Sequence, residues 1–249
     1  MMKKLNKKNS PSKSDGMMHP DQIVEQSERP KSGRTTSEEA NLEKERYYTE
    51  GYFSHAQFIS YSEQIRLVHS LDRKDVLEIG IGNGIVTDFL RKAGLNVTSF
   101  DINQHLIPEV VGSVTDLNAI FQHRKFDIIL CAEVLEHIPF EYFEQAIANI
   151  AGTTNEYAII TLPRCQKILI DIQFAIKIPK LPYFEKGLCL SIPNSNIPPN
   201  HYWELDSSKE TKIKEIDTIL KRHFAILDSS RFRFRSYHHY FILKKLTAN

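Results

Sequence analysis

A loop of alternating glycines follows the short apolar run at residues 75–79, and Glu78 precedes it. Glycine has no side chain, so a ligand can approach the backbone closely where such a loop follows a strand. We therefore predict a cofactor-binding loop here. The loop residues expected to contact the cofactor are Gly80, Ile81, Gly82, Asn83 and Gly84.

The charge and spacing of this loop limit which cofactor it accepts. A dinucleotide fingerprint of the form GxGxxG requires its third glycine at position 85, where this chain has Ile85. The carboxylate of Glu78 would repel a pyrophosphate, whereas it would attract an ammonium or sulfonium group. The loop therefore favours a nucleoside with a net positive charge over NAD.

A second carboxylate lies at the end of the next predicted strand. Asp101 closes the run at residues 96–100, seventeen residues after Gly84, and Ile102 follows it. A carboxylate at the end of the second strand can accept hydrogen bonds from both hydroxyls of a ribose. We therefore expect Asp101 and Ile102 to contact the ribose of the cofactor.

Four stretches of the chain, in this order, resemble the motifs of class I S-adenosylmethionine (SAM) dependent methyltransferases. They are Glu78 with the glycine triplet, Asp101, the sequence GSVTDL at 112–117 and the sequence FDIILCAEVLEHIP at 126–139. The resemblance implies SAM as cofactor, with Ser113 and Val114 near the adenine and Ala132 and Glu133 on the cofactor side. Ser113 replaces the aspartate usual in the family, so its contact is an expectation that Asp116 could also fulfil.

Three side chains are candidates for catalysis. His137 follows a strand whose end faces the expected cleft, and the ordinary pKa of histidine suits a general base near neutral pH. It could equally hold a loop by hydrogen bonding. His201, in the sequence PPNHYWELD, is the second candidate, and the resemblance places Glu133 beside the reacting centre.

A metal-assisted reaction is an alternative. Glu133, Glu136 and His137 form an ExxEH pattern that, with His201, resembles the metal-binding set of small-RNA 2′-O-methyltransferases and, more loosely, of metal-dependent quinone-biosynthesis O-methyltransferases. Carboxylates and imidazoles could hold Mg²⁺, Mn²⁺ or Zn²⁺ and polarise a hydroxyl nucleophile. The main expectation remains a metal-free enzyme that methylates a small molecule at oxygen, such as a sugar or a lipid-linked intermediate. An alternative of another class is a non-catalytic SAM-binding scaffold.

The elements that must position these residues alternate between short apolar runs and helical patterns. This alternation predicts an α/β fold with a Rossmann-like, doubly wound, mostly parallel sheet of seven strands. The last two runs, at 224–230 and 237–245, are too close in sequence for a helical crossover, which predicts a C-terminal antiparallel hairpin. Residues 46–249 are expected to form the methyltransferase domain, with a lid inserted at about 163–205.

Composition restricts the partners and the compartment. Residues 1–45 are rich in Lys, Ser, Glu and Pro and predict a disordered tail. The formal net charge of +1 gives no general attraction to nucleic acid, and no apolar run is long enough to span a bilayer. Three cysteines without CxxC spacing suit a reducing cytoplasm. Neither a nucleic-acid partner nor a membrane span is expected, and the sequence leaves the oligomeric state open.

Overall fold

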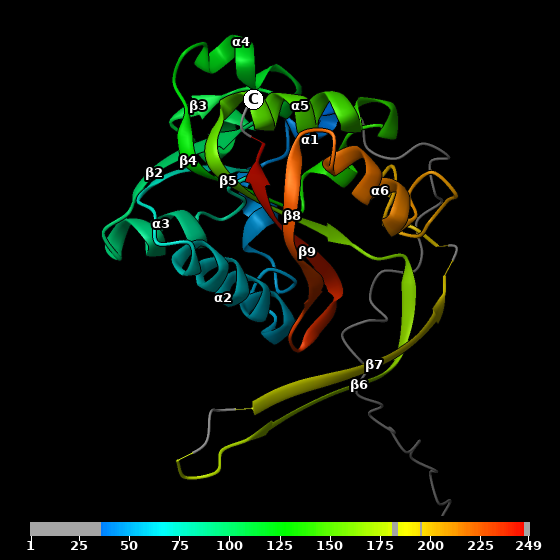
Figure 1. The fold of residues 1–249 in the computed structure, drawn as a ribbon. Coiled ribbons are helices and arrows are strands. Elements are labelled where there is room, and N and C mark those ends of the chain that lie inside the picture. Colours follow the sequence, from blue (N-terminus) through cyan, green and yellow to red (C-terminus); the bar gives the residue numbers. More distant parts are fainter. Residues whose placement is uncertain (1–35, 181–183, 195, 247–249) are drawn as a thin grey trace, which may run out of the picture. The chain divides into compact units, whose positions relative to one another are not determined.

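The computed structural model describes residues 36–180, 184–194 and 196–246. A seven-stranded sheet with strand order β3-β2-β1-β4-β5-β9-β8 forms its centre (Figure 1). Strands β1 to β5 run parallel to one another, and β9 is antiparallel to both β5 and β8. This confirms the predicted Rossmann-like sheet. Its strands are β1 (Asp75–Ile79), β2 (Asn96–Asp101), β3 (Val110–Val111), β4 (Phe126–Ala132), β5 (Thr154–Pro163), β8 (Phe224–Phe232) and β9 (Arg235–Lys245).

Helices cover both faces of the sheet, which is why its central strands read as continuous apolar runs rather than alternating ones. One buried apolar cluster joins α2 and α3 to the sheet, and a second joins α4, α5 and α6 to its other face. The α-helices are α1 (Thr36–Glu39), α2 (His55–Ser70), α3 (Ile85–Lys92), α4 (Leu117–Phe121), α5 (Phe143–Thr153) and α6 (Ile213–Leu220). Short 3₁₀ helices are η2 (Lys44–Tyr48), η3 (Gln104–Leu106), η4 (Val114–Asp116), η5 (Leu135–His137) and η6 (Phe140–Tyr142).

The C-terminal strands pair as predicted. Only Arg233 and Phe234 connect β8 to β9, and Phe234 has a positive φ of 57° in this tight turn. Ile226 pairs with Leu243, and Leu243 in turn pairs with Ala158 of β5. Strand β9 therefore adds the antiparallel hairpin to the parallel part of the sheet.

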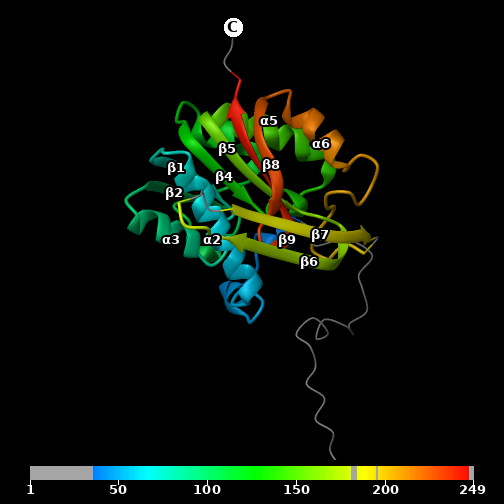
Figure 2. The same cartoon turned by 60° about the horizontal axis from the view of Figure 1, so that its bottom comes forward.

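The insertion predicted at 163–205 contains a second, separate sheet of two strands, β6 (Gln166–Ile176) and β7 (Phe184–Pro193). We call β6 and β7 the long hairpin. Its strands pair antiparallel from Gln166 opposite Pro193 to Ile176 opposite Phe184. In both Figure 1 and Figure 2 it runs beside the end of the main sheet where β8 turns into β9.

Part of the predicted tail is folded. Residues 1–35 lie outside the described residues, but 36–45 contain α1 and the start of η2. The backbone oxygen of Leu42 accepts a hydrogen bond of 2.8 Å from the buried side chain of Asn103. Residues 36–45 thus contact the second strand's end, a contact between distant positions that composition does not reveal. Among the described residues, no helix has the length and apolar character needed to cross a bilayer.

Candidate active site

The glycine loop leaves β1 in a conformation that L side chains rarely adopt. Gly80, Gly82 and Gly84 have φ angles of 80°, 53° and 76°. A Cβ atom on Gly80 would lie 2.2 Å from a methyl carbon of Val134, so both backbone geometry and space require glycine there. Gly84 then caps α3 at its N-terminus. The loop therefore presents bare backbone above the ends of the first two strands.

Asp101 holds this loop from the neighbouring strand. Its carboxylate accepts hydrogen bonds from the backbone N–H of Ile81 (2.9 Å) and of Asn103 (2.8 Å). Burial raises the pKa of Asp101, and the backbone N–H groups around it, including that of Ile102, oppose the rise. The structure thus brings the two predicted cofactor segments into direct contact.

Glu78 lies underneath the loop rather than on its open surface. Its carboxylate accepts a hydrogen bond from the hydroxyl of Thr87 in α3, and only 3% of the residue is exposed. Burial raises the pKa of Glu78 to about 8. The side chain therefore braces the loop against α3, and a charge interaction with a bound ligand would act through the loop or a water molecule.

The loop forms one wall of a cavity of about 210 Å³. The short helix η2 contributes Lys44 and Tyr48 to its lining, and the Tyr48 hydroxyl donates a hydrogen bond to the backbone oxygen of Asn83 (3.3 Å). The Asn83 side chain donates to the Tyr61 hydroxyl in α2 (2.9 Å). The lining residues are Lys44, Tyr48, Ile81, Gly82, Asn83, Gly84, His105, Leu106 and Ile107.

The residues of the GSVTDL segment that are predicted to contact the cofactor have structural roles in the fold. The Ser113 hydroxyl caps η4 by accepting a hydrogen bond from the Thr115 backbone N–H (3.3 Å), and Val114 is buried in the apolar core. Asp116 precedes α4 without a side-chain capping bond. Neither Ser113 nor Val114 lines the cavity at the glycine loop.

Glu133, directly after Ala132 at the end of β4, belongs to a network of buried polar groups. Its φ is 54°, and its carboxylate accepts a hydrogen bond of 2.6 Å from the hydroxyl of Thr161 in β5. The other carboxylate oxygen lies 3.3 Å from Nε2 of His238, whose Nδ1 is 3.1 Å from the Ser60 hydroxyl. Burial raises the pKa of Glu133 to about 7 and lowers that of His238 well below its ordinary value. A carboxylate near the point of half-protonation at neutral pH is suited to proton transfer.

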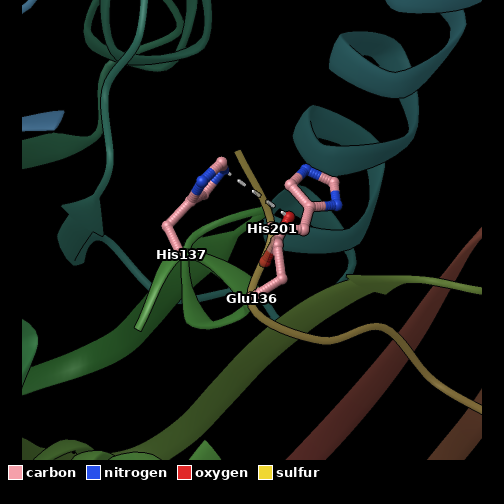
Figure 3. A group of neighbouring side chains, drawn as sticks. All are labelled: Glu136, His137 and His201. Atoms are coloured by element: carbon pink, nitrogen blue, oxygen red, sulfur yellow. Dashed lines mark ion pairs between the residues drawn. The ribbon is translucent and has the colours of Figure 1, made fainter. Parts of the chain in front are cut away.

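His137 and His201 lie together next to Glu136. Their rings are 4.9 Å apart and perpendicular, and the buried carboxylate of Glu136 points toward them (Figure 3). One ligand atom from each of Glu136, His137 and His201 lies within 4.8 Å of the others. Both carboxylate oxygens of Glu136 are buried without a hydrogen-bond partner among the described residues, and burial with the charge of Glu133 raises its pKa well above the ordinary range.

The hydrogen bonds of the two histidines define which nitrogen faces this cluster. Nδ1 of His137 lies 2.9 Å from the backbone oxygen of Asn200, and Nδ1 of His201 lies 2.9 Å from a carboxylate oxygen of Glu204. When a neutral imidazole donates from Nδ1 to such an acceptor, its lone pair is on Nε2. Both rings can then accept a proton, or coordinate a cation, through Nε2.

Sequence reasoning missed several polar residues of this region. His238, Glu204 and Tyr237 are far from ExxEH in the sequence, but the hydroxyl of Tyr237 donates to Glu204 (2.5 Å), which in turn contacts His201. Tyr237 and His238 are adjacent in the sequence, but only the pairing of β9 with β5 brings them to this region, and the sequence does not reveal that pairing. Trp203, beside His201, packs in the core and donates to the backbone oxygen of Ile138 (3.1 Å).

Comparison with known proteins agrees with this geometry. Residues 52–167 match a family model described as a methyltransferase domain. A ubiquinone biosynthesis O-methyltransferase of Hydrogenovibrio crunogenus is 31% identical over 90 residues, covering 31% of this chain and 37% of the relative. One of Glaesserella parasuis is 31% identical over 126 residues, covering 42% of this chain and 53% of the relative. The chain thus spans between about a third and about half of the length of these curated relatives.

Solved structures agree with the fold. The N-methyltransferase NodS of Bradyrhizobium japonicum, in complex with S-adenosylhomocysteine, superposes with a TM-score of 0.54 at 13% identity, covering 85% of this chain and 97% of NodS. The PH0226 protein of Pyrococcus horikoshii superposes with a TM-score of 0.51 at 12% identity, covering 79% and 94%. The match of residues 52–167 to the methyltransferase domain model, the strand order and these superpositions together show a Rossmann-like methyltransferase fold.

Proposed function

We propose that the protein transfers the methyl group of SAM to a hydroxyl oxygen of a small-molecule acceptor. The observation that carries the proposal is the direct bond between the glycine loop and Asp101, since it unites bare backbone and a carboxylate at adjacent strand ends. Transfer to oxygen is supported by the names of the curated relatives, which are O-methyltransferases over the matched part.

The residues at the loop suit a zwitterionic nucleoside. The backbone of Gly80 to Gly84 would face the methionine end, Lys44 in the cavity wall would attract its carboxylate, and Asp101 with Ile102 would meet the ribose. Bound SAM supplies an electrophilic methyl group on a positively charged sulfur. Because η2 covers the loop, the cavity of about 210 Å³ accommodates part of such a ligand, and we expect residues 44–48 to shift when it enters.

The side chains at the end of β4 provide proton acceptors for the acceptor hydroxyl. His137 donates from Nδ1 to Asn200, so that its Nε2 can take the hydroxyl proton. Glu133 and His201 lie nearby and could share the proton, since Glu133 titrates near neutral pH. Alignment of the reacting atoms accelerates the reaction more than the base does. Alignment gives an effective molarity of about 10⁵ to 10⁸ M, whereas a general base accelerates the reaction roughly 10² to 10⁴ fold.

Calorimetric titration tests the cofactor assignment. SAM and S-adenosylhomocysteine should bind and NAD should not. Asp101→Asn should weaken SAM binding by about tenfold or more, the value of one charge-assisted hydrogen bond. Asp127→Asn, in strand β4 of the same sheet, is the matched control and should bind SAM as the natural chain does. Binding of NAD without binding of SAM would refute the assignment.

Transfer of label from SAM tests the reaction. The full chain should label a small-molecule or lipid fraction of a cell extract at oxygen, and His137→Ala should reduce the rate. Saturable SAM binding without labelling of any fraction would instead favour the non-catalytic scaffold.

A second candidate function is methyl transfer assisted by a divalent cation. The specific observation in its favour is the buried carboxylate of Glu136, which has no hydrogen-bond partner among the described residues and lies beside two imidazoles oriented by Asn200 and Glu204. These donors fit Mn²⁺ or Zn²⁺. When bound, such an ion would act as a Lewis acid on the acceptor oxygen.

Metal addition distinguishes the two candidates. If a cation is used, Mn²⁺ or Zn²⁺ should raise the melting temperature of the chelator-treated protein, and Glu136→Gln should abolish the rise. Glu141→Gln, an exposed residue close in sequence, is the control. An unchanged methylation rate in the presence of chelator excludes the metal-assisted reaction. An RNA acceptor would show binding that depends on RNA length and falls steeply with salt.

A further inference from the structure

One arginine lies at the edge of the sheet where the parallel strands end, close to the candidate catalytic residues. Arg235 begins β9, which is antiparallel to β5, and His238 of β9 stands opposite Pro163 at the carboxyl end of β5. Arg235 therefore lies beyond the end of β5, on the same edge of the sheet as the glycine loop and Glu133. Ligands of such sheets bind at the carboxyl ends of the parallel strands.

The surroundings of Arg235 connect it to the catalytic residues. Its guanidinium lies over the ring of Tyr237, 5.6 Å from the ring centre. The Tyr237 hydroxyl donates to Glu204, which in turn contacts Nδ1 of His201. Burial raises the pKa of Glu133, and the positive charge of Arg235 is among the effects that oppose the rise. Arg235 is thus close to both halves of the catalytic region.

The guanidinium of Arg235 lacks the partner that most arginines of this chain have. Across the described ranges, no carboxylate oxygen lies within ion-pair distance of it, and its Nε is buried without a hydrogen-bond acceptor. A buried donor without an acceptor is destabilising, so its presence in a folded protein calls for an acceptor from elsewhere, such as a ligand. Arginines that do have a carboxylate partner are Arg66, Arg73, Arg91, Arg164 and Arg222.

The carboxylates near Arg235 are bonded to other groups. Glu204 accepts a hydrogen bond of 2.5 Å from the hydroxyl of Tyr237. Glu133 accepts one of 2.6 Å from the hydroxyl of Thr161. The paired donors of the Arg235 guanidinium are therefore not used by the carboxylates of the catalytic region that the structure describes.

We propose that Arg235 binds a carboxylate of the methyl acceptor, while the hydroxyl to be methylated lies at His137. The inference rests on the proposed function, because it names the class of acceptor for the same site, a hydroxy acid. The planar fork of a guanidinium matches the two oxygens of a carboxylate, and bonds between two charged groups are stronger than those between neutral ones. Arg235 would hold one end of the acceptor and so orient its hydroxyl toward the methyl group of SAM.

Calorimetric titration of the full chain with bound S-adenosylhomocysteine tests the carboxylate site. The probes are 3-hydroxybenzoate and its neutral counterpart 3-hydroxybenzamide, in which an amide replaces the carboxylate. The natural chain should bind the carboxylate about tenfold more tightly, as expected for a charge-assisted hydrogen bond that the amide cannot make. Arg235→Gln should remove this preference. Arg235→Lys keeps the charge without the fork and should retain only part of the preference.

Arg222→Gln is the matched control, because Arg222 follows α6 and is paired with Glu144. This variant should keep the full preference for the carboxylate. Urea denaturation shows whether the variants fold, and if Arg235→Gln does not, Arg235→Lys decides the test. The proposal is overturned if the natural chain binds neither probe or binds both alike. It is also overturned if the preference is unchanged in the folded Arg235 variant.

Transfer of label from SAM separates this proposal from that of methyl transfer itself. The labelled product of a cell extract should be retained by an anion-exchange resin at neutral pH, also after phosphatase treatment. Arg235→Gln should raise the KM for the acceptor about tenfold and change kcat little. A labelled product that passes through the resin upholds methyl transfer and overturns the carboxylate site. Binding of 3-hydroxybenzoate that depends on Arg235, without any labelled product, upholds the site and contradicts the proposed function.

Discussion

Replacement of Gly80 by alanine tests whether the glycine loop is shaped by steric contact as well as by backbone geometry. Two costs add at this position. A left-handed conformation costs an L residue about 1–2 kcal/mol, and placing a Cβ atom 2.2 Å from a Val134 methyl carbon forces a local repacking that typically costs about 1–3 kcal/mol. We therefore expect Gly80→Ala to lower the free energy of unfolding by about 2–5 kcal/mol.

Gly84 is the matched control for this substitution. Its φ of 76° is close to the 80° of Gly80, but a Cβ atom there would have no neighbour within 4 Å. Gly84→Ala should therefore cost only the conformational part, about 1–2 kcal/mol. The double variant Gly80→Ala with Val134→Ala should recover part of the loss, which appears as a coupling energy in a double-mutant cycle.

Urea denaturation measures the natural chain, the single variants Gly80→Ala, Gly84→Ala and Val134→Ala, and the double variant. An unchanged dependence of unfolding free energy on urea would show that the folded state is retained. Gly80→Ala should also weaken SAM binding more than Gly84→Ala does, since Val134 adjoins Glu133. Equal losses of stability at Gly80 and Gly84, or no coupling between Gly80 and Val134, would refute the steric argument.

Three further predictions concern the polar groups around the site. In the ligand-free protein the raised pKa of Glu78 means that the folded state binds a proton more tightly than the unfolded state. This contribution to stability is complete below pH 4.5 and is lost as pH rises through about 8. Glu78→Gln should remove that part of the pH dependence of the melting temperature. Tyr61→Phe removes the acceptor of the Asn83 side chain and should lower the free energy of unfolding by about 0.5–1.5 kcal/mol in urea, with SAM binding weakened. Thr161→Val removes a donor that lowers the pKa of Glu133, so the acidic limb of the pH–rate profile should move to higher pH, and an unmoved limb would show that Glu133 does not govern it.

The sequence predicted those parts of the fold that local patterns encode. The run at 75–79 forms β1 without change, and the spacing of the last two runs correctly required antiparallel pairing. Each of these features depends on neighbours within a few residues. The order of the strands was not predicted, because it depends on pairing between segments that are distant in the sequence.

The candidate site was less predictable because it depends on contacts between distant residues. Glu133, Glu136, His137 and His201 could be selected from the sequence, but the partners that orient them come from elsewhere. His238, for example, meets Glu133 only because β9 lies beside β5. In the same way, the sequence selects Glu78 as a group that attracts a cationic ligand, but it does not reveal that the carboxylate accepts a hydrogen bond from the hydroxyl of Thr87 in the following helix.

The long hairpin leaves the main sheet and returns to it at one point. Cys165 donates its backbone N–H to Leu205 at 2.8 Å, Leu205 donates to Pro163 at 2.9 Å, and Gln166 stands opposite Pro193 where the hairpin begins. The length of the hairpin between these contacts therefore does not determine the position of His201, which follows the hairpin in the chain. Shortening or lengthening the hairpin would therefore leave the backbone contacts of Cys165 and Leu205 in place.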